Sequence, residues 1–214
     1  MAEEKIVVMT ATELEQRPLR DRLGDWERAG RRVVWRVGGM GAGAMAAATV
    51  EAVRAERPGV VVLVGIGGAR PGVSLEVAET VLVGSDRQAD LGAWRSETGR
   101  FEPFDGWAEE AETIVCPYVE RLGARFRVSG ARSVNAACAP VPWREGEEVE
   151  SMEGAAFFGA CRMAGVAFLQ LRAISNRVGD RRDAWRIPEA LRSLADALEG
   201  LLNAPELLNL RDRG

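Results

Sequence analysis

The run Val60-Val61-Val62-Leu63-Val64 is the feature that most constrains the fold of this chain. Every position is apolar and most are β-branched, so both faces of a strand formed by this run must be buried. Strands buried on both faces are typical of parallel sheets that carry helices on each side. Further apolar runs alternate with helical patterns, and no linker or internal repeat interrupts them. The sequence therefore predicts one α/β domain, residues 1–214, folded as a three-layer sandwich around a mixed, mostly parallel central sheet.

The order of the predicted elements follows from periodicity and from helix-start and helix-stop residues. Strands are expected at residues 6–9, 32–37, 60–64, 80–83, 124–129 and 167–174. Helices are expected to open at Thr12 and to cover residues 44–56, 108–122, 154–164 and 187–202. The last helix is amphipathic, with Leu191, Leu194, Leu198 and Leu201 at spacings of three and four. Residues 87–106 and 134–149 lack periodicity, so we expect a long functional loop and an irregular segment there.

Two absences narrow the chemistry open to this chain. There is no histidine, which excludes Ser-His-Asp and Cys-His nucleophiles and nearly all catalytic zinc sites. Lys5 is the single lysine, and its place before the first apolar run suits neither a Walker A loop nor a pyridoxal phosphate enzyme. The chemistry must rest on carboxylates, amides, hydroxyls and arginines, and we expect neither a metal nor a cofactor.

The net charge and the cysteines limit the possible binding partners and the cellular compartment of the protein. The net charge of −4 argues against a nucleic-acid partner, which needs a basic face. No apolar run is long enough for a membrane span and no leader pattern opens the chain, so we expect neither a membrane segment nor a signal peptide. The cysteines (Cys116, Cys138 and Cys161) are odd in number and widely spaced, which predicts reduced thiols in the cytoplasm.

Candidate site residues lie where predicted strands end, because ligands of α/β sheets bind beyond the carboxyl ends of the strands. Four such segments are residues 11–15, 38–43, 65–68 and 175–176, and residues 151–154 open a helix. Each also has a structural interpretation. Thr12 and Glu15 have the spacing of a capping box, so Glu15 could cap a helix rather than act on a substrate. Glu153 at a helix start could simply stabilise the helix dipole.

The glycine turns and the polar residues of the last predicted strand also have both a functional and a structural interpretation. Gly39–Gly43 resembles a dinucleotide fingerprint with the wrong spacing, and a tight strand-to-helix turn explains it as well. Gly65–Gly68 allows close approach of either a ligand or a neighbouring strand. Arg172 and Asn176 flank the end of an apolar strand, where structural hydrogen bonds are the default. The residues alone thus indicate a carboxylate-based pocket without naming a substrate.

Two longer motifs carry a resemblance to a known family. Ser151-Met-Glu-Gly-Ala-Ala156 is followed, after a helix and a strand, by Arg172-Ala-Ile-Ser-Asn176. This pair resembles the nucleoside phosphorylase and nucleosidase superfamily, and within it the futalosine hydrolases of menaquinone biosynthesis. The similarity extends to residues 5–15 and 129–135 and covers nearly the whole chain. It implies the nucleoside phosphorylase-like fold, N-glycosidic bond hydrolysis, no cofactor and a homo-oligomer.

The resemblance also implies roles for individual residues. Glu15 matches the carboxylate that activates water, and Asn176 matches the side chain that binds N7 of the purine. Glu153 matches the group that binds the ribose hydroxyls, with Met152 packed against the sugar. The remaining substrate-binding positions are Ser133 and Val134 beside the base, Ile66, Gly67 and Gly68 in the glycine turn, and Arg172 in support of the pocket.

The choice of purine follows from one departure within the superfamily. Methylthioadenosine nucleosidases have aspartate at the position of Asn176, which suits a 6-aminopurine, whereas asparagine is similar to the phosphorylases of 6-oxopurines. The resemblance thus favours a hypoxanthine base, as in futalosine. A phosphate-dependent phosphorylase, a methylthioadenosine-type nucleosidase, a nucleotide-binding oxidoreductase and a non-catalytic purine-binding module remain alternatives.

Overall fold

The computed structural model describes residues 4–28, 30–104, 112–122 and 124–210. Its strands are β1 (Glu4–Thr10), β2 (Glu27–Arg28), β3 (Arg31–Val37), β4 (Val60–Ala69), β5 (Thr80–Asp86), β6 (Gly92–Arg95), β7 (Arg100–Pro103), β8 (Ile114–Val115), β9 (Val128–Ser133), β10 (Glu147–Ser151) and β11 (Ala167–Arg177). Its helices are α1 (Glu13–Leu23), α2 (Ala42–Glu56), α3 (Val119–Leu122), α4 (Gly154–Ala164), α5 (Ile187–Leu202) and the short 3₁₀ turns η2 (Arg182–Ala184) and η3 (Pro205–Asn209).

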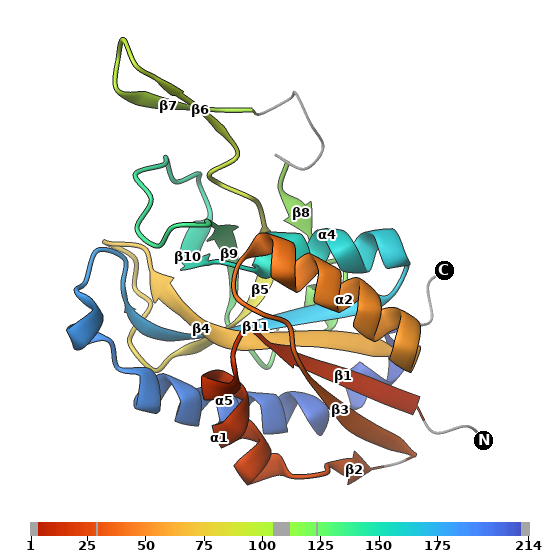
Figure 1. Cartoon of the computed structure of the whole chain (residues 1–214). Coiled ribbons are helices and arrows are strands. Elements are labelled where there is room, and N and C mark those ends of the chain that lie inside the picture. Colours follow the sequence, from red (N-terminus) through yellow and green to blue (C-terminus); the bar gives the residue numbers. More distant parts are fainter. Residues whose placement is uncertain (1–3, 29, 105–111, 123, 211–214) are drawn as a thin grey trace.

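A mixed sheet forms the middle layer of the molecule. Its strand order is β10-β9-β5-β11-β4-β1-β3-β2, with β8 paired to β5. The pairs β11–β4, β4–β1, β1–β3, β5–β9 and β9–β10 are parallel, while β11–β5 and β10–β4 are antiparallel. Helices α2 and α4 cover one face and α1 and α5 the other (Figure 1). The predicted three-layer α/β sandwich is confirmed.

The centre of the sheet is apolar on both sides, as the sequence indicated. Strands β4 and β11 are buried along nearly their whole length, and each runs longer than predicted. Strand β4 continues through Gly65–Gly68 to Ala69, so these glycines form part of the strand and not a turn beyond it. Helix α5 has the predicted bounds and buries Leu191, Leu194, Leu198 and Leu201 against the sheet.

Three predictions between residues 87 and 133 are wrong in the part the structure describes. The structure has β8 and the one-turn helix α3 in place of the helix predicted at 108–122, of which residues 108–111 lie outside the described residues. Pro117 interrupts the predicted helix, because proline lacks the N–H that a helix interior needs. The strand predicted at 124–129 lies four residues later, at β9, where Gly130 pairs within the sheet.

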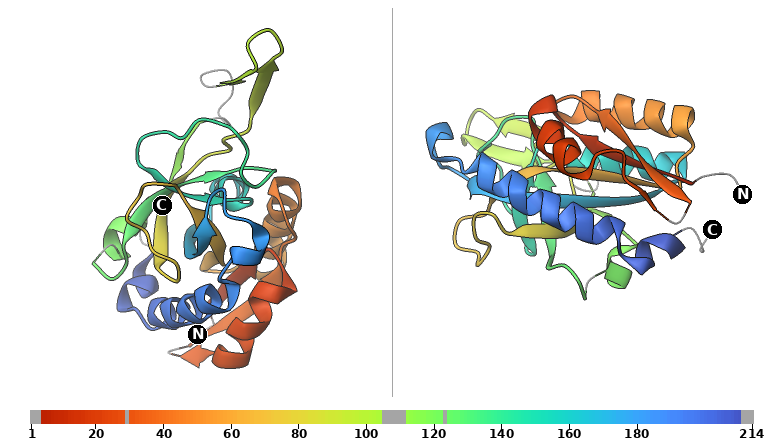
Figure 2. Two further views of the ribbon diagram at one scale, coloured as in Figure 1. Left: turned by 90° about the vertical axis from the view of Figure 1, so that its left-hand side faces the viewer. Right: turned by 90° about the horizontal axis from the view of Figure 1, so that it is seen from below.

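The predicted loop at 87–106 contains a β-hairpin. Strands β6 and β7 pair, and the rings of Trp94 and Phe101 meet edge to face with centroids 5.6 Å apart. The hairpin projects from the body of the protein (Figures 1 and 2). The irregular segment predicted at 134–149 is irregular up to β10, which begins at Glu147.

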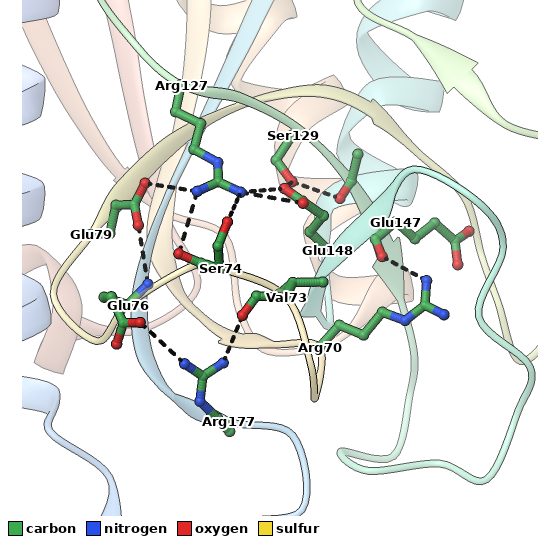
Figure 3. Close-up of polar contacts among 11 residues, drawn as sticks. Arg70, Val73, Ser74, Glu76, Glu79, Arg127, Ser129, Glu147, Glu148 and Arg177 are labelled. Carbon is green, nitrogen blue, oxygen red and sulfur yellow. Dashed lines mark hydrogen bonds and ion pairs between the residues drawn. The ribbon is translucent and has the colours of Figure 1, made fainter.

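Two half-buried arginines, Arg127 and Arg177, contact the segment between β4 and β5. Arg127 donates to the hydroxyl of Ser74 and forms ion pairs with Glu79 and Glu148, and Arg177 donates to the carbonyl of Val73 (Figure 3). These contacts fix the chain where β4 and β11 end, which is the edge that holds the cavity described below. No helix in the described ranges combines the length and apolar character needed to cross a membrane.

Candidate active site

A cavity of about 280 Å³ opens where β1, β4, β10 and β11 end. This is the edge at which the sequence placed the candidate segments. Its lining includes most of the predicted site residues: Glu15, Ile66, Gly67, Gly68, Met152, Glu153, Arg172 and Asn176. It also includes Ala11, Thr12, Leu14, Met40, Ala137, Cys138, Glu150, Ser151, Ser175, Val178, Arg182 and Trp185.

Glu15 is a helix cap and a cavity residue at once. Its backbone N–H donates to the Thr12 hydroxyl, and its carboxylate Oε2 accepts from the backbone N–H of Thr12 at 3.1 Å, which is the complete capping box. The other oxygen, Oε1, accepts from the backbone N–H of Ile66 at 3.1 Å. The two interpretations of Glu15 are therefore not alternatives: the cap fixes the side chain, and the bond to β4 holds it beside the cavity.

The electrostatic setting of Glu15 suits a base. The side chain is 5% exposed, and this burial raises the pKa of its carboxyl above the ordinary value. The positive charge of Arg172 opposes the rise, and the carboxylate of Glu153 adds to it. A carboxylate with a raised pKa binds a proton more readily than an ordinary one, yet the nearby guanidinium favours its ionised form.

Arg172 lies between the two carboxylates. Its guanidinium is 3.4 Å from Glu153 Oε2 and donates to the carbonyl of Ile66 at 3.2 Å. Its Nε atom is buried and has no hydrogen-bond partner within the described residues. Gly65 makes this arrangement possible, because a Cβ there would lie 2.7 Å from Arg172 Nη1 and 2.8 Å from Glu15 Oε1.

Glu153 does not cap its own helix. It occupies the N-cap position of α4, but its side chain makes no capping hydrogen bond. Its Oε1 instead accepts from the backbone N–H of Gly41 at 3.1 Å, and Gly41 is the N-cap of α2. The dinucleotide interpretation of Gly39–Gly43 thus loses an amide that a phosphate would need, because that amide already faces a carboxylate.

Asn176 makes local hydrogen bonds in this structure. Its amide nitrogen donates to the carbonyl of Arg177 at 2.8 Å, and its oxygen accepts from the hydroxyl of Ser175 at 2.8 Å. The amide packs over Gly68, where a Cβ would be 3.2 Å from Nδ2. The structural hydrogen bonds expected by default are therefore present, and the residue also lines the cavity. To bind a ligand with both amide groups, the side chain must exchange these local bonds.

Ser133 and Val134 are not brought to the cavity. Both are fully buried and neither lines it. The Ser133 hydroxyl accepts from the N–H of Ala155 in α4 and donates to Asp86 Oδ1, each at 2.9 Å. The part of the segment that does reach the cavity is Ala137 and Cys138, a few residues further on.

Asp86 is a buried carboxyl group that the sequence analysis missed. It has no exposed surface, and burial raises the pKa of Asp86 to about 7. Besides Ser133, it accepts from Gln170 Nε2 at 3.3 Å, while Gln170 Oε1 has no partner among the described residues. The only sequence signal was a carboxylate at the end of an apolar strand.

The segment beyond β9 is held by ion pairs that the sequence also did not reveal. Arg132 and Glu150 are both almost fully buried, and Nε and Nη2 of Arg132 donate to the same carboxylate oxygen, Glu150 Oε2. The guanidinium of Arg132 stacks 3.5 Å from the ring centroid of Trp143. Glu150 Oε1 also accepts from the backbone N–H of Cys138 at 2.8 Å. This network fixes one wall of the cavity.

The thiols and acids of the described residues form no metal-binding group. No three potential ligands among His, Cys, Asp and Glu come together in the described ranges. Cys116 and Cys161 are free and buried, and burial raises the pKa of both, that of Cys116 to about 11. Cys138 is free and exposed at the cavity wall.

Comparison with known proteins finds similar sequences and similar solved structures. No protein-family model matches the chain. A curated futalosine hydrolase of Streptomyces coelicolor is 37% identical over 153 residues, 64% of this chain and 63% of that protein. One of Acidothermus cellulolyticus is 34% identical over 142 residues, 58% of this chain and 57% of that protein. The matched segments thus span less than two thirds of these relatives.

Solved structures match over nearly the full length of the chain. The 5′-methylthioadenosine/S-adenosylhomocysteine nucleosidase of Helicobacter pylori superposes with a TM-score of 0.74 at 17% identity, covering 95% of this chain and 99% of that one. The futalosine hydrolase of the same organism superposes with a TM-score of 0.72 at 17% identity, covering 94% and 98%. The chain has the nucleosidase fold. The predicted nucleoside phosphorylase-like fold is thereby confirmed.

Proposed function

We propose that the protein hydrolyses the N-glycosidic bond of a 6-oxopurine nucleoside, with futalosine as its substrate. The products would be hypoxanthine and dehypoxanthine futalosine, a step of menaquinone biosynthesis. The observation that carries the proposal is the placement of Glu15 and Glu153 on one cavity, with the Arg172 guanidinium between them. The similarity to curated futalosine hydrolases supports the choice of substrate.

Glu15 acts as the general base in this proposal. Breaking the bond leaves an oxocarbenium-like sugar, which water attacks once a base removes its proton. Three hydrogen bonds, from the N–H and hydroxyl of Thr12 and from the N–H of Ile66, hold the Glu15 carboxylate in place. Such a fixed base needs no reorganisation in the transition state.

Glu153 and Asn176 act on the two ends of the bond that breaks. The Glu153 carboxylate accepts hydrogen bonds from the vicinal ribose hydroxyls, with Met152 against the sugar. Asn176 turns from its local bonds and donates to N7, where negative charge develops as the base leaves. Ile66, Gly67 and Gly68 offer a surface without bulky polar groups to the substrate.

The environment of the glycine strand favours water over phosphate as the nucleophile. The N–H of Ile66 already donates to the Glu15 carboxylate, and the negative charge of that carboxylate would repel a phosphate bound beside it. Arg70, a nearby cation that could bind phosphate, donates instead to the carbonyl of Glu147 (Figure 3). It also donates to the carbonyl of Arg144. It does not line the cavity.

The phosphorylase alternative is tested by assaying nucleoside cleavage in phosphate-free buffer and then adding phosphate. We expect full activity without phosphate and free sugar as the product. A strict phosphate requirement, or a sugar 1-phosphate product, would overturn the hydrolase proposal. If no free base is released under either condition, the non-catalytic purine-binding module becomes the better account.

We further propose that the chain is one domain, works in the cytoplasm and assembles with copies of itself. Exposed apolar side chains support assembly: Leu14 and Met40 at the cavity mouth, and Trp94 on the projecting hairpin, are each more than half exposed. The free cysteines support a reducing compartment. Analytical ultracentrifugation tests the assembly, and a monomer at micromolar concentration would contradict it.

A further inference from the structure

The charged residues of the cavity differ in whether they already have partners. Glu15, Glu150 and Glu153 each accept hydrogen bonds from fixed donors, and Arg172 donates to Glu153 and to a backbone carbonyl. Arg182 is the exception. It lines the cavity from η2, is exposed, and forms no ion pair with any acid in the described part of the chain.

The guanidinium of Arg182 is nevertheless held in place. It lies against the ring of Trp185, 4.5 Å from the ring centroid. The indole N–H donates to the carbonyl of Asp180 at 3.3 Å, and the N–H of Arg186 donates to the carbonyl of Ser175 in β11 at 2.8 Å. The cation is therefore supported on an aromatic face whose position the backbone fixes.

The cavity that Arg182 lines also has exposed apolar side chains. Leu14 and Met40 line the same cavity and are 61% and 64% exposed, and the indole of Trp185 lines it as well. Exposed apolar side chains and an unpaired guanidinium that line one cavity fit a ligand group that is flat, apolar and anionic at one end. An aromatic carboxylate has this chemistry.

We propose that Arg182 and Trp185 form a carboxylate-binding subsite for the end of the substrate that lies away from the purine. This inference rests on the proposed function, because futalosine carries a carboxyphenyl group on its sugar side. The guanidinium pairs with the carboxylate, and the apolar side chains at the mouth contact the aryl ring. The subsite selects futalosine over nucleosides with a short or uncharged sugar substituent.

The test compares futalosine with its methyl ester, which has nearly the same shape and no negative charge. KM and kcat are measured for both in the wild type, in Arg182→Gln and in Arg181→Gln. Arg181 is the matched control, since it is the preceding residue, its side chain is 87% exposed, it pairs with Asp183 and it does not line the cavity. Glutamine keeps a polar side chain that can form hydrogen bonds, shorter than that of arginine, while removing the charge.

We expect Arg182→Gln to raise KM for futalosine about tenfold, the order expected for losing a hydrogen bond between charged groups. The preference of the wild type for the acid over the ester should collapse, kcat should change little, and Arg181→Gln should keep the preference. An unchanged acid-to-ester ratio in Arg182→Gln, or an equal change in the control, would overturn the subsite. Competitive inhibition by inorganic phosphate that disappears in Arg182→Gln would instead assign the cation to phosphate. If the wild type released no base from futalosine, the proposed function itself would be refuted. This result differs from a failure of the subsite alone, in which the wild type still cleaves futalosine.

Discussion

Gly65 lies beside two groups of the proposed hydrolytic centre, the Arg172 guanidinium and the Glu15 carboxylate. A methyl group at this position would sit 2.7 Å from Arg172 Nη1 and 2.8 Å from Glu15 Oε1. Contacts below 3.0 Å are not tolerated by real Cβ atoms, and ordinary contact begins near 3.4 Å. Gly65→Ala must therefore displace the carboxylate, the guanidinium or both by more than half an ångström, without removing any functional group.

The displacement should reduce catalysis far more than it reduces stability. A misplacement of about 1 Å can lower the rate about 100-fold, and we expect kcat/KM to fall by roughly that factor. Forcing one methyl group into a packed site costs about 1–3 kcal/mol of the free energy of unfolding, so the variant should remain folded at 25 °C. Release of free base measures kcat/KM, and urea unfolding followed by circular dichroism measures stability.

Gly43→Ala is the matched control for this substitution. Gly43 lies in α2 near the same cavity edge, and a Cβ there would meet no atom within 4 Å. Alanine also has the higher helix propensity, by about 1 kcal/mol, so this variant should keep full activity with equal or greater stability. If Gly65→Ala keeps kcat/KM within threefold of the wild type, the positions of Glu15 and Arg172 do not govern the reaction.

Three further substitutions test other parts of the account. Glu153→Ala should weaken substrate capture and turnover together while leaving the affinity for free hypoxanthine nearly unchanged; equal losses for nucleoside and base would show that Glu153 only shapes the cavity. Asn176→Asp should shift kcat/KM from futalosine toward aminodeoxyfutalosine by roughly 5- to 150-fold, the effect of one unpaired buried polar group, and a constant ratio would contradict its role. Asp86→Asn should change how stability depends on pH. Burial raises the pKa of Asp86 from 3.8 to about 7, so between these two pH values the folded protein holds a proton that the unfolded chain has lost. The free energy of unfolding therefore falls as pH rises from 3.8 to about 7, by up to about 4 kcal/mol. Urea unfolding at several pH values should show that Asp86→Asn removes this fall, and parallel curves for the two proteins would exclude it.

The sequence predicted the layers of the fold because they depend on local patterns. The β-branched run at Val60–Val64 and the leucine spacing of α5 each require a particular burial, and the structure provides it. The region from 87 to 133 was predicted less well. There the strands β8 and β9 form through pairing with β5, a long-range contact that no window of sequence contains.

The candidate site shows the same division. Glu15 and Glu153 could be singled out because each opens a helix at the correct edge of the sheet. The capping pattern could not reveal that Glu15 also accepts a hydrogen bond from the backbone N–H of Ile66, 51 residues away. Arg182 and Trp185 gave no signal at all, because their place at the cavity depends on the conformation of the chain between β11 and α5.

The central claim is tested most directly by one substrate panel in phosphate-free buffer, with futalosine, inosine, aminodeoxyfutalosine and methylthioadenosine followed for released base. We expect hypoxanthine release from futalosine with the highest kcat/KM of the four. Preferred cleavage of methylthioadenosine or aminodeoxyfutalosine, or no base released from any of them, would contradict it.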